Sequence, residues 1–426
     1  MFSPLLDGIG AGLTSWSTLS LIIIALVSYI VMVKRLRYRR RAEIEAPFAS
    51  GGRPLSSMTA KEAHEIIQKL QELEFPYAFG KARKLALLKA GAIPTMSKLF
   101  AVTGQNNKRN AGKRAVDTEI LLREAQSKRR DSERYATAVA RMNYLHARYR
   151  SANKITDNDL LHTLGDGLVE ILNVVDRDEW RKLTDVEKCA AGVFHKNLGD
   201  DMKIPFDPLP SDDDGWRDGL HFAAELRDWT LKYEGEVAKP VPTNDQYVRV
   251  YVDSALSSLP SFVRVTLRKT LGADLDDIMR ASLCLESPGP ILSTFLKAVR
   301  NSRIFYLRHL SLPRSSSSPV KLVNDAPNPG TKLYNFGRKS LQPWYMKPTI
   351  LSTWGPGAWL VRAFGGKVPG ARGDRYVPQG YDLMTIGPEP QKGKGIDEMM
   401  SDIEVIMGKS VAMCPFSQAK AGIINP

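Results

Sequence analysis

Six histidines are the first residues to consider as carriers of chemistry, because an imidazole can ligate a metal or move a proton near neutral pH. Only one lies on a clearly apolar helical face: Val139, Met142 and Tyr149 are seven, four and three residues from His146 and share its side of a helix. A neutral histidine facing an apolar interior is what a haem iron needs as an axial ligand. The same spacing also fits a histidine that is simply packed in the core, so spacing alone leaves both interpretations open. The other five histidines have ordinary surroundings: His64, His162, His195, His221 and His309.

Other familiar motifs fail on residue type or spacing. His64-Glu-Ile-Ile-Gln68 begins like a zinc-protease helix, but glutamine stands where the second histidine ligand belongs. The stretch from Gly387 to Lys394 resembles a phosphate-binding loop, yet its spacing is one residue too long and no serine or threonine follows the lysine. The three cysteines are odd in number and far apart, without a Cys-x-x-Cys pair, so they predict neither a disulfide framework nor a zinc site: Cys189, Cys284 and Cys414.

A hydrophobic segment near the N-terminus predicts a membrane anchor. No charged residue occurs from Gly8 to Val33, and residues 13–33 are long enough to cross a bilayer, which takes about 20 residues. A cleaved signal peptide would carry positive charge before its apolar core, whereas here the positive charges follow it. The positive-inside bias then places the N-terminus in a lumen and the body in the cytosol. The basic residues are Lys34, Arg35, Arg37, Arg39, Arg40 and Arg41.

The charge of the whole chain does not indicate nucleic-acid binding. The 426 residues carry a formal net charge of +14, but part of the excess is the basic run beside the membrane segment, where anionic lipid explains it. The remaining excess is spread along the chain, and no stripe of basic and aromatic residues accompanies it. We therefore expect a lipid bilayer, and no nucleic acid, as a partner.

The rest of the chain predicts an all-α body followed by an irregular C-terminal region. Thr59 with Glu62 and Thr184 with Glu187 have the spacing of capping boxes, and Thr156 with Asp159 is a weaker version. We expect an anchor and basic flank at residues 1–42, a linker at 43–56, a helical core at 57–312, and an irregular region at 313–426 that packs on the core. The spacing of apolar residues predicts helices at about 59–73, 81–90, 117–126, 131–151, 156–174, 184–199, 213–234, 244–258, 261–271 and 288–310.

Several short segments, in their order and spacing, carry a resemblance to a known family. In these segments the chain resembles the MpaB-type ER-bound oxygenases of fungi, which look like a distant branch of the family of latex-clearing rubber oxygenases. The likeness includes the anchor with its basic flank and extends over nearly the whole chain. The segments are Leu73-Glu-Phe-Pro-Tyr77, Lys113-Arg-Ala-Val-Asp-Thr118, Ser132-Glu-Arg134 leading to Leu145-His146, Lys154-Ile-Thr-Asp-Asn-Asp-Leu-Leu161, Leu183-Thr-Asp-Val-Glu187 and Tyr376-Val-Pro-Gln-Gly-Tyr381.

The resemblance implies a protein of the endoplasmic reticulum membrane with a globin-like helical core that binds haem b, an iron cofactor. Such an enzyme uses O2 to cleave a carbon–carbon double bond in a prenyl chain of the farnesyl type, as in fungal meroterpenoid secondary metabolism. Its expected partners are the bilayer, an apolar prenylated small molecule and O2. A dry apolar slot for the prenyl chain is what the protein itself would supply.

The resemblance also implies roles for individual residues. His146 would ligate the iron, and Arg150, four residues later, would help to bind the haem. Arg114-Ala-Val-Asp-Thr118 corresponds to the family's Arg-x-x-Lys-Thr motif near the distal haem face, so Arg114, Asp117 and Thr118 would be the catalytic residues. Asp117 replaces the family's lysine, which changes both charge and proton delivery there. Asn143 replaces an arginine three residues before the axial histidine.

Two other functions remain open from the sequence. The first is a haem-dependent hydroxylase or peroxidase of a lipid-like substrate, which the substitution at Asp117 favours. The second is a non-catalytic, membrane-tethered interaction protein without a cofactor. In that case Arg114, Asp117 and Thr118 would simply form the start of a helix.

Overall fold

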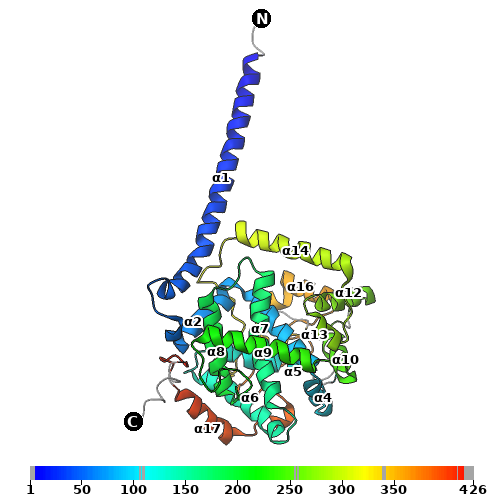
Figure 1. Ribbon diagram of the computed structural model, residues 1–426. Coiled ribbons are helices and arrows are strands. Elements are labelled where there is room, and N and C mark those ends of the chain that lie inside the picture. The colour runs from blue at the N-terminus through cyan, green and yellow to red at the C-terminus, as the bar shows by residue number, and fades with distance from the viewer. Residues whose placement is uncertain are drawn as a thin grey trace.

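The computed structural model describes residues 5–104, 107, 111–253, 256, 259–337, 342–409 and 411–416 (Figure 1). It is 66% helical, and the described residues form no strands beyond two isolated bridges, so the prediction of an all-α fold is confirmed. The helices are α1 (Leu5–Glu45), α2 (Ala60–Lys69), α3 (Pro76–Lys89), α4 (Pro94–Val102), α5 (Ala111–Ser127), α6 (Glu133–Ser151), α7 (Asp157–Asp178), α8 (Asp185–Asp201), α9 (Gly219–Val237), α10 (Pro242–Val248), α12 (Ser261–Gly272), α13 (Asp277–Ser282), α14 (Gly289–His309), α15 (Ile350–Trp354), α16 (Pro356–Ala363) and α17 (Ile396–Met407).

Helix α1 projects from the body of the protein (Figure 1). Its apolar side chains are exposed, as Leu21 (67%) and Ile24 (60%) show, up to the point where Val33 becomes fully buried against the body. Among the described residues, α1 is the helix that by itself is long and apolar enough to span a bilayer. The predicted candidate span is therefore confirmed.

Three helix starts are capping boxes, as the sequence predicts. In each, the threonine side chain accepts a hydrogen bond from the backbone N–H of the acidic residue three positions later, and that residue's carboxylate accepts one from the threonine N–H. These boxes fix the starts of α2, α7 and α8. Thr156 with Asp159 is thus as complete as the other two.

The structure departs from the predicted helices at one helix start and in several helices that the sequence did not predict. Helix α9 begins at Gly219 and not near residue 213, because Asp218 caps it by accepting from the His221 N–H. Helices α4, α13, α15, α16 and α17 were not predicted. Helix α17 packs against α6, so the region after residue 313 contains an element of the helical core.

Helices α7, α8 and α9 pack on one another, with α2 on α8 and α3 on α7. Trp180, at the end of α7, is fully buried, and Tyr38 of α1 meets its ring edge-on at 5.2 Å. The base of α1 is thus part of the core. Helices α5 and α6 pack against each other and carry the site residues that the sequence predicts.

Candidate functional site

A cavity of about 830 Å³ lies between α4, α5, α6 and the C-terminal region. Sites for cofactors and small molecules usually measure about 300–1,000 Å³. Its apolar walls include Leu99, Phe100, Leu121, Leu145 and Trp344. Four cationic side chains also line it: Lys113, Arg114, Arg148 and Arg375. An apolar cavity with several cations suits a flat apolar molecule that carries acidic groups.

Helix α5 turns one face towards this cavity. Arg114, Asp117, Thr118 and Leu121 all line it, and their spacing of three, four and seven residues places them on one side of a helix. The Arg114 guanidinium lies 4.0 Å from the centre of the Phe100 ring and donates a hydrogen bond to the Tyr251 hydroxyl at 3.1 Å. Arg114 is thereby positioned by α4 and by the turn after α10.

Asp117 is held by two donors from different parts of the chain. Its side chain is buried, its Oδ2 accepts from Lys113 Nζ at 2.8 Å, and its Oδ1 accepts from the Tyr345 hydroxyl at 2.7 Å. Burial raises the pKa of Asp117, and the Lys113 charge and both hydrogen bonds oppose that rise. Lys113 also donates to the Gly387 carbonyl at 3.0 Å. Such a carboxylate, with a cation and a phenol beside it, can hold or release a proton at the cavity wall.

Thr118 lies one residue further along α5 and lines the same cavity. Its hydroxyl has no hydrogen-bond partner among the residues that the structure describes. A threonine inside a helix often donates back to a carbonyl of the preceding turn, but Thr118 does not. Its hydroxyl is therefore available to a molecule in the cavity.

His146 reaches the cavity from α6. Its imidazole is half-buried and has no hydrogen-bond or ion-pair partner in the described part of the chain, whereas His195 bonds to the Ala191 carbonyl at 2.7 Å. Burial, followed by the charges of Arg150 and Arg114, lowers the pKa of His146 to about 4. At neutral pH this histidine is uncharged, as a metal ligand must be, and neither ring nitrogen is occupied by a described residue, so one of them can bind a metal ion.

Arg150 lies on a different side of α6 from the cavity. It binds Asp157 at 2.8 Å and the carbonyl of Lys203 at 3.0 Å. With His146 it lines a second, smaller cavity of about 320 Å³. The structure thus brings Arg114, Asp117, Thr118 and His146 to one cavity and places Arg150 outside it.

Sequence reasoning missed most of the residues that line or support this cavity, including Arg148 of α6. Lys113 could have been found, because it lies one helical turn before Asp117, where opposite charges pair. Trp344, Tyr345 and Arg375 come from the C-terminal region, and no local pattern links them to α5.

The rim formed by residues 387–391 is fixed by one buried arginine. Arg141 of α6 is fully buried and donates to the carbonyls of Ile386 at 2.8 Å, Gln391 at 3.0 Å and Thr385 at 3.3 Å. This is the segment whose sequence resembles a phosphate loop; it forms a wall of the cavity. Arg141, together with the bond from Lys113 to the Gly387 carbonyl, therefore holds that wall in position.

A second cluster of possible metal ligands is already occupied by a protein cation. His162, Asp166 and Glu234 are buried with their ligand atoms within 4.8 Å of one another. The ammonium of Lys89 lies 2.9 Å from Asp166, 2.8 Å from Glu234 and 3.2 Å from Glu170. The Lys89 ammonium compensates the negative charge of these carboxylates. We therefore infer that the cluster stabilises the fold and does not bind a metal ion.

No family model matches the chain, but three curated relatives do. The chain is 34% identical over 408 residues to the ER-bound oxygenase mpaB' of Penicillium brevicompactum, a match covering 95% of each protein. It is 32% identical over 376 residues to the ER-bound oxygenase mpaB of the same species, covering 88% of this chain and 87% of the relative. The ER-bound oxygenase mpaB of Penicillium roqueforti (strain FM164) is 35% identical over 260 residues, 61% of this chain and 87% of the relative. With relatives of this similarity over nearly its whole length, and with a candidate membrane span, the chain belongs to the family of ER-bound oxygenases that includes MpaB.

Proposed function

We propose that this oxygenase binds haem b in the cavity between α5 and α6, where His146 would ligate the iron. With O2 it would cleave a carbon–carbon double bond in the prenyl side chain of an apolar substrate. The observation that carries the proposal is the neutral His146 imidazole, without a partner among the described residues, in a large cavity with both apolar and cationic walls.

The residues of the cavity fit a haem. Leu99, Phe100, Leu121 and Trp344 provide apolar surface for the macrocycle and for a prenyl chain. Arginine and lysine side chains at its edge provide charge-assisted hydrogen bonds for the two propionates. When bound, the haem would supply the activation of O2, and the protein would supply orientation and exclusion of water.

The cations that line the cavity also suggest which residues meet the propionates. Arg114 and Arg148 both line it, whereas Arg150 reaches Asp157 and the Lys203 carbonyl. We therefore propose Arg114 and Arg148 for the propionates. Arg150 would act through its charge, which helps to keep His146 neutral.

Asp117 and Thr118 would act on the substrate side of the reaction. Asp117 could accept a proton at a carboxylate oxygen while Lys113 and Tyr345 hold it in place. The free hydroxyl of Thr118 could orient a polar atom in the cavity. Hydroxylation or peroxidation of a lipid-like substrate is the second candidate, because Asp117 replaces the family's lysine. The ammonium of Lys113, 2.8 Å from Asp117, restores a cation at this point and weakens that argument.

We further propose that the N-terminus lies in the lumen of the endoplasmic reticulum and the body in the cytosol. The basic residues after the span support this orientation. The chain has no Asn-x-Ser/Thr sequon, so a sequon added before residue 5 would be a clean reporter. We expect glycosylation of that sequon in microsomes. A second sequon, added to an exposed loop of the body, should stay unmodified. Glycosylation of the second sequon alone would show that the orientation is the opposite one.

The visible spectrum of the detergent-purified, haem-supplied protein tests the cofactor. We expect a Soret band that is lost or clearly shifted in His146→Ala and retained in the control His221→Ala, whose imidazole pairs with Glu225 away from the cavity. A folded, haem-supplied protein without a Soret band would refute the haem proposal. For the reaction, the mass of the product decides: cleavage adds both atoms of O2 across a broken alkene, whereas hydroxylation leaves the carbon chain intact.

A further inference from the structure

Helix α14 presents its apolar side chains to the outside. Ile291, Phe295 and Val299 are four residues apart and share one face, and their exposed fractions are 87%, 60% and 52%. Phe305 and Tyr306 continue this outward face and are 59% and 54% exposed. A surface helix of a soluble protein normally turns such a face towards the core.

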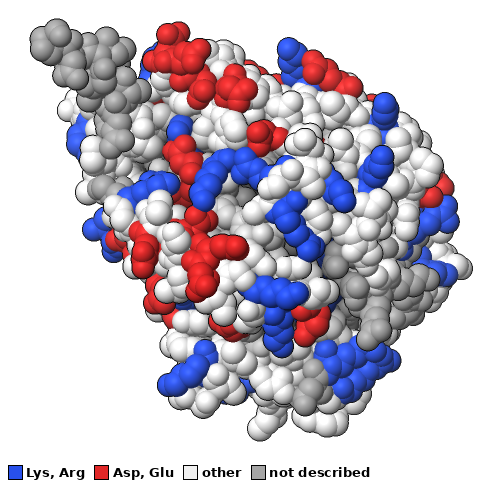
Figure 2. Space-filling view, turned by 90° about the horizontal axis from the view of Figure 1, so that it is seen from below, with Lys and Arg blue, Asp and Glu red and all other residues white. Residues whose placement is uncertain are grey.

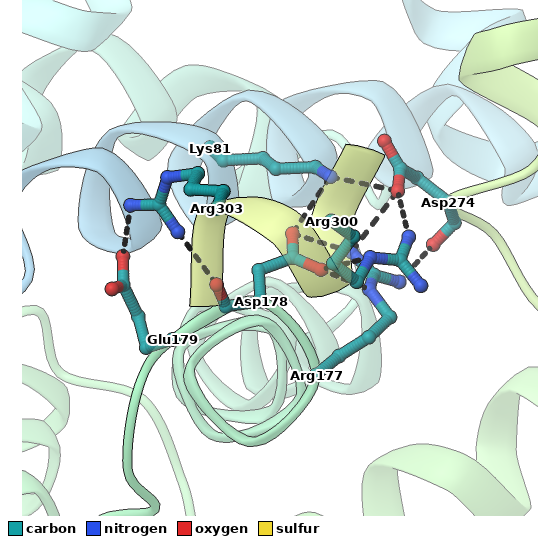
Figure 3. A network of polar contacts seen from close by, with 7 residues as sticks. All are labelled: Lys81, Arg177, Asp178, Glu179, Asp274, Arg300 and Arg303. Atoms are coloured by element: carbon teal, nitrogen blue, oxygen red, sulfur yellow. Dashed lines mark hydrogen bonds and ion pairs between the residues drawn. The ribbon is translucent and has the colours of Figure 1, made fainter. Parts of the chain in front are cut away.

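The arginines of the same helix contact the body. Arg300 lies 2.8 Å from Asp178, and Arg303 lies 2.9 Å from Glu179 and donates to the Asp178 carbonyl at 2.6 Å (Figure 3). Lys81 joins the same network by bridging Asp178 and Asp274 at 2.8 and 2.7 Å (Figure 3). These ion pairs hold α14 so that its apolar face remains outward.

The end of α14 meets α1 where the apolar part of α1 stops. The Tyr29 hydroxyl donates to the Leu310 carbonyl at 2.8 Å, and Arg37 Nε donates to the Ser311 carbonyl at 2.8 Å. Between these two positions the sequence of α1 changes from apolar to basic after Val33. Since that change marks the edge of the bilayer core, α14 starts from the level of the membrane surface.

Helices α15 and α16 expose further apolar side chains. Trp354 is 64% exposed, Trp359 62% and Ile350 85%, and tryptophan is enriched at membrane–water interfaces. The Arg362 guanidinium lies 4.9 Å from the Trp354 ring, so a cation accompanies the aromatic side chains. Figure 1 places α16 in the same part of the body as α14, towards the end from which α1 leaves. On the opposite end, lysine and arginine side chains are interspersed with aspartate and glutamate (Figure 2).

We infer that the outward sides of α14, α15 and α16 form a membrane face that rests in the headgroup region of the bilayer spanned by α1. Interfacial helices bind in this way, with their apolar side chains at the boundary between headgroups and acyl chains. The occupant is the bilayer and not another protein, because the face continues directly from α1. The body is thus held against the membrane at two places, and its orientation is fixed.

Spin labels on the full-length protein test this membrane face. The protein is placed in phosphatidylcholine nanodiscs that hold one chain each. A nitroxide is attached at Phe295→Cys or at Trp359→Cys. Both variants also carry Cys284→Ser, because Cys284 is the exposed cysteine among the described residues and would otherwise be labelled too. Ile22→Cys in α1 provides the membrane reference. Glu404→Cys in α17, exposed at the end of the body opposite α1, provides the water reference (Figure 1). Collision with dissolved O2 and with a water-soluble nickel chelate is measured for each label.

We expect the labels at 295 and 359 to resemble the label at 22, with several-fold more O2 collision relative to nickel collision than the label at 404. Labels at 295 and 359 that match the label at 404 would overturn the inference. The labels at 295 and 359 could instead be protected from the nickel chelate in detergent oligomers but not in single-chain nanodiscs. A second copy of the chain would then cover the face, and this result would also overturn the inference. The measurement needs neither haem nor turnover, so its outcome is independent of the proposed reaction. Circular dichroism of each labelled variant confirms that it is folded.

Discussion

The Tyr345 hydroxyl donates a hydrogen bond to the Asp117 carboxylate at 2.7 Å, although 228 positions separate the two residues. This bond joins α5 to the C-terminal region at the wall of the cavity. The region after residue 313 is therefore part of the site and not only a cover for the helical core.

Asp117→Asn should slow turnover about 100-fold if the carboxylate moves a proton, because general acid–base groups contribute about 10²–10⁴-fold. The Soret band should remain, since His146 and the apolar walls are unchanged. Steady-state oxygen consumption alongside the visible spectrum measures both effects. Turnover equal to that of the unmodified protein would remove Asp117 from the mechanism.

Tyr345→Phe is the matched test of the bond to Asp117. Loss of this hydrogen bond removes a contact that lowers the pKa of Asp117, so the pKa should rise further. If ionised Asp117 is required, the acid limb of the pH–rate profile should move to higher pH. The free energy of unfolding should fall by only about 1 kcal/mol, as for a single hydrogen bond. A profile that does not move would show that Asp117 ionisation does not limit the rate.

Haem binding should persist to unusually low pH. Iron binds only the neutral imidazole, and the pKa of His146 is lowered to about 4 from the ordinary value of 6.5. Binding should therefore be nearly constant from pH 8 to 5 and weaken as the pH falls towards about 4. A haem titration at each pH measures this.

The fold must be checked in the same samples. His64 and His195 are also buried with pKa values of about 4, so the unfolded chain binds more protons than the folded chain below pH 6.5. Stability is consequently lost as the pH falls from 6.5 towards 4. A loss of haem binding centred near pH 6.5 in protein that is still folded would contradict the prediction.

Arg141→Met should loosen the rim at residues 385–394. The substitution leaves the buried Ile386 carbonyl without this donor, at a cost of about 1–3 kcal/mol, and also removes the donor to the part-buried carbonyls of Thr385 and Gln391. Hydrogen exchange in that segment should speed up and haem affinity should fall. Arg227→Met, which removes an exposed arginine paired with Asp228, is the control and should change neither. An unchanged rate of hydrogen exchange in the rim would mean that α17 keeps this segment in place without Arg141.

Lys89→Met should destabilise the fold strongly. Methionine has a similar length but leaves Asp166, Glu170 and Glu234 without their cation, and breaking such a buried network costs about 3–5 kcal/mol. The matched control is Lys232→Met on α9, where the side chain is 76% exposed and its ion pair with Glu236 spans 3.9 Å. Chemical denaturation should show less than about 1 kcal/mol of change for the control. Similar values for the two variants would show that Lys89 is not essential to this cluster.

The sequence by itself determined the features whose physics is local. The span in α1 follows from an uninterrupted apolar run, and the starts of α2, α7 and α8 follow from capping boxes that need only a threonine and an acidic residue three positions apart. The spacing of Arg114, Asp117 and Thr118 likewise predicts one face of a helix.

Only the tertiary structure decided which residues meet that face. Tyr345 and the rim at 387–391 reach the cavity through contacts between segments more than 200 residues apart, which no periodicity encodes. Arg150 shares the helix of His146 but turns to Asp157, because the first turn of α7 lies within its reach. The outward apolar face of α14 was also hidden in the sequence, since the same pattern normally predicts a buried helix. Its direction depends on Asp178 and Glu179, which bind its arginines from a distant part of the chain.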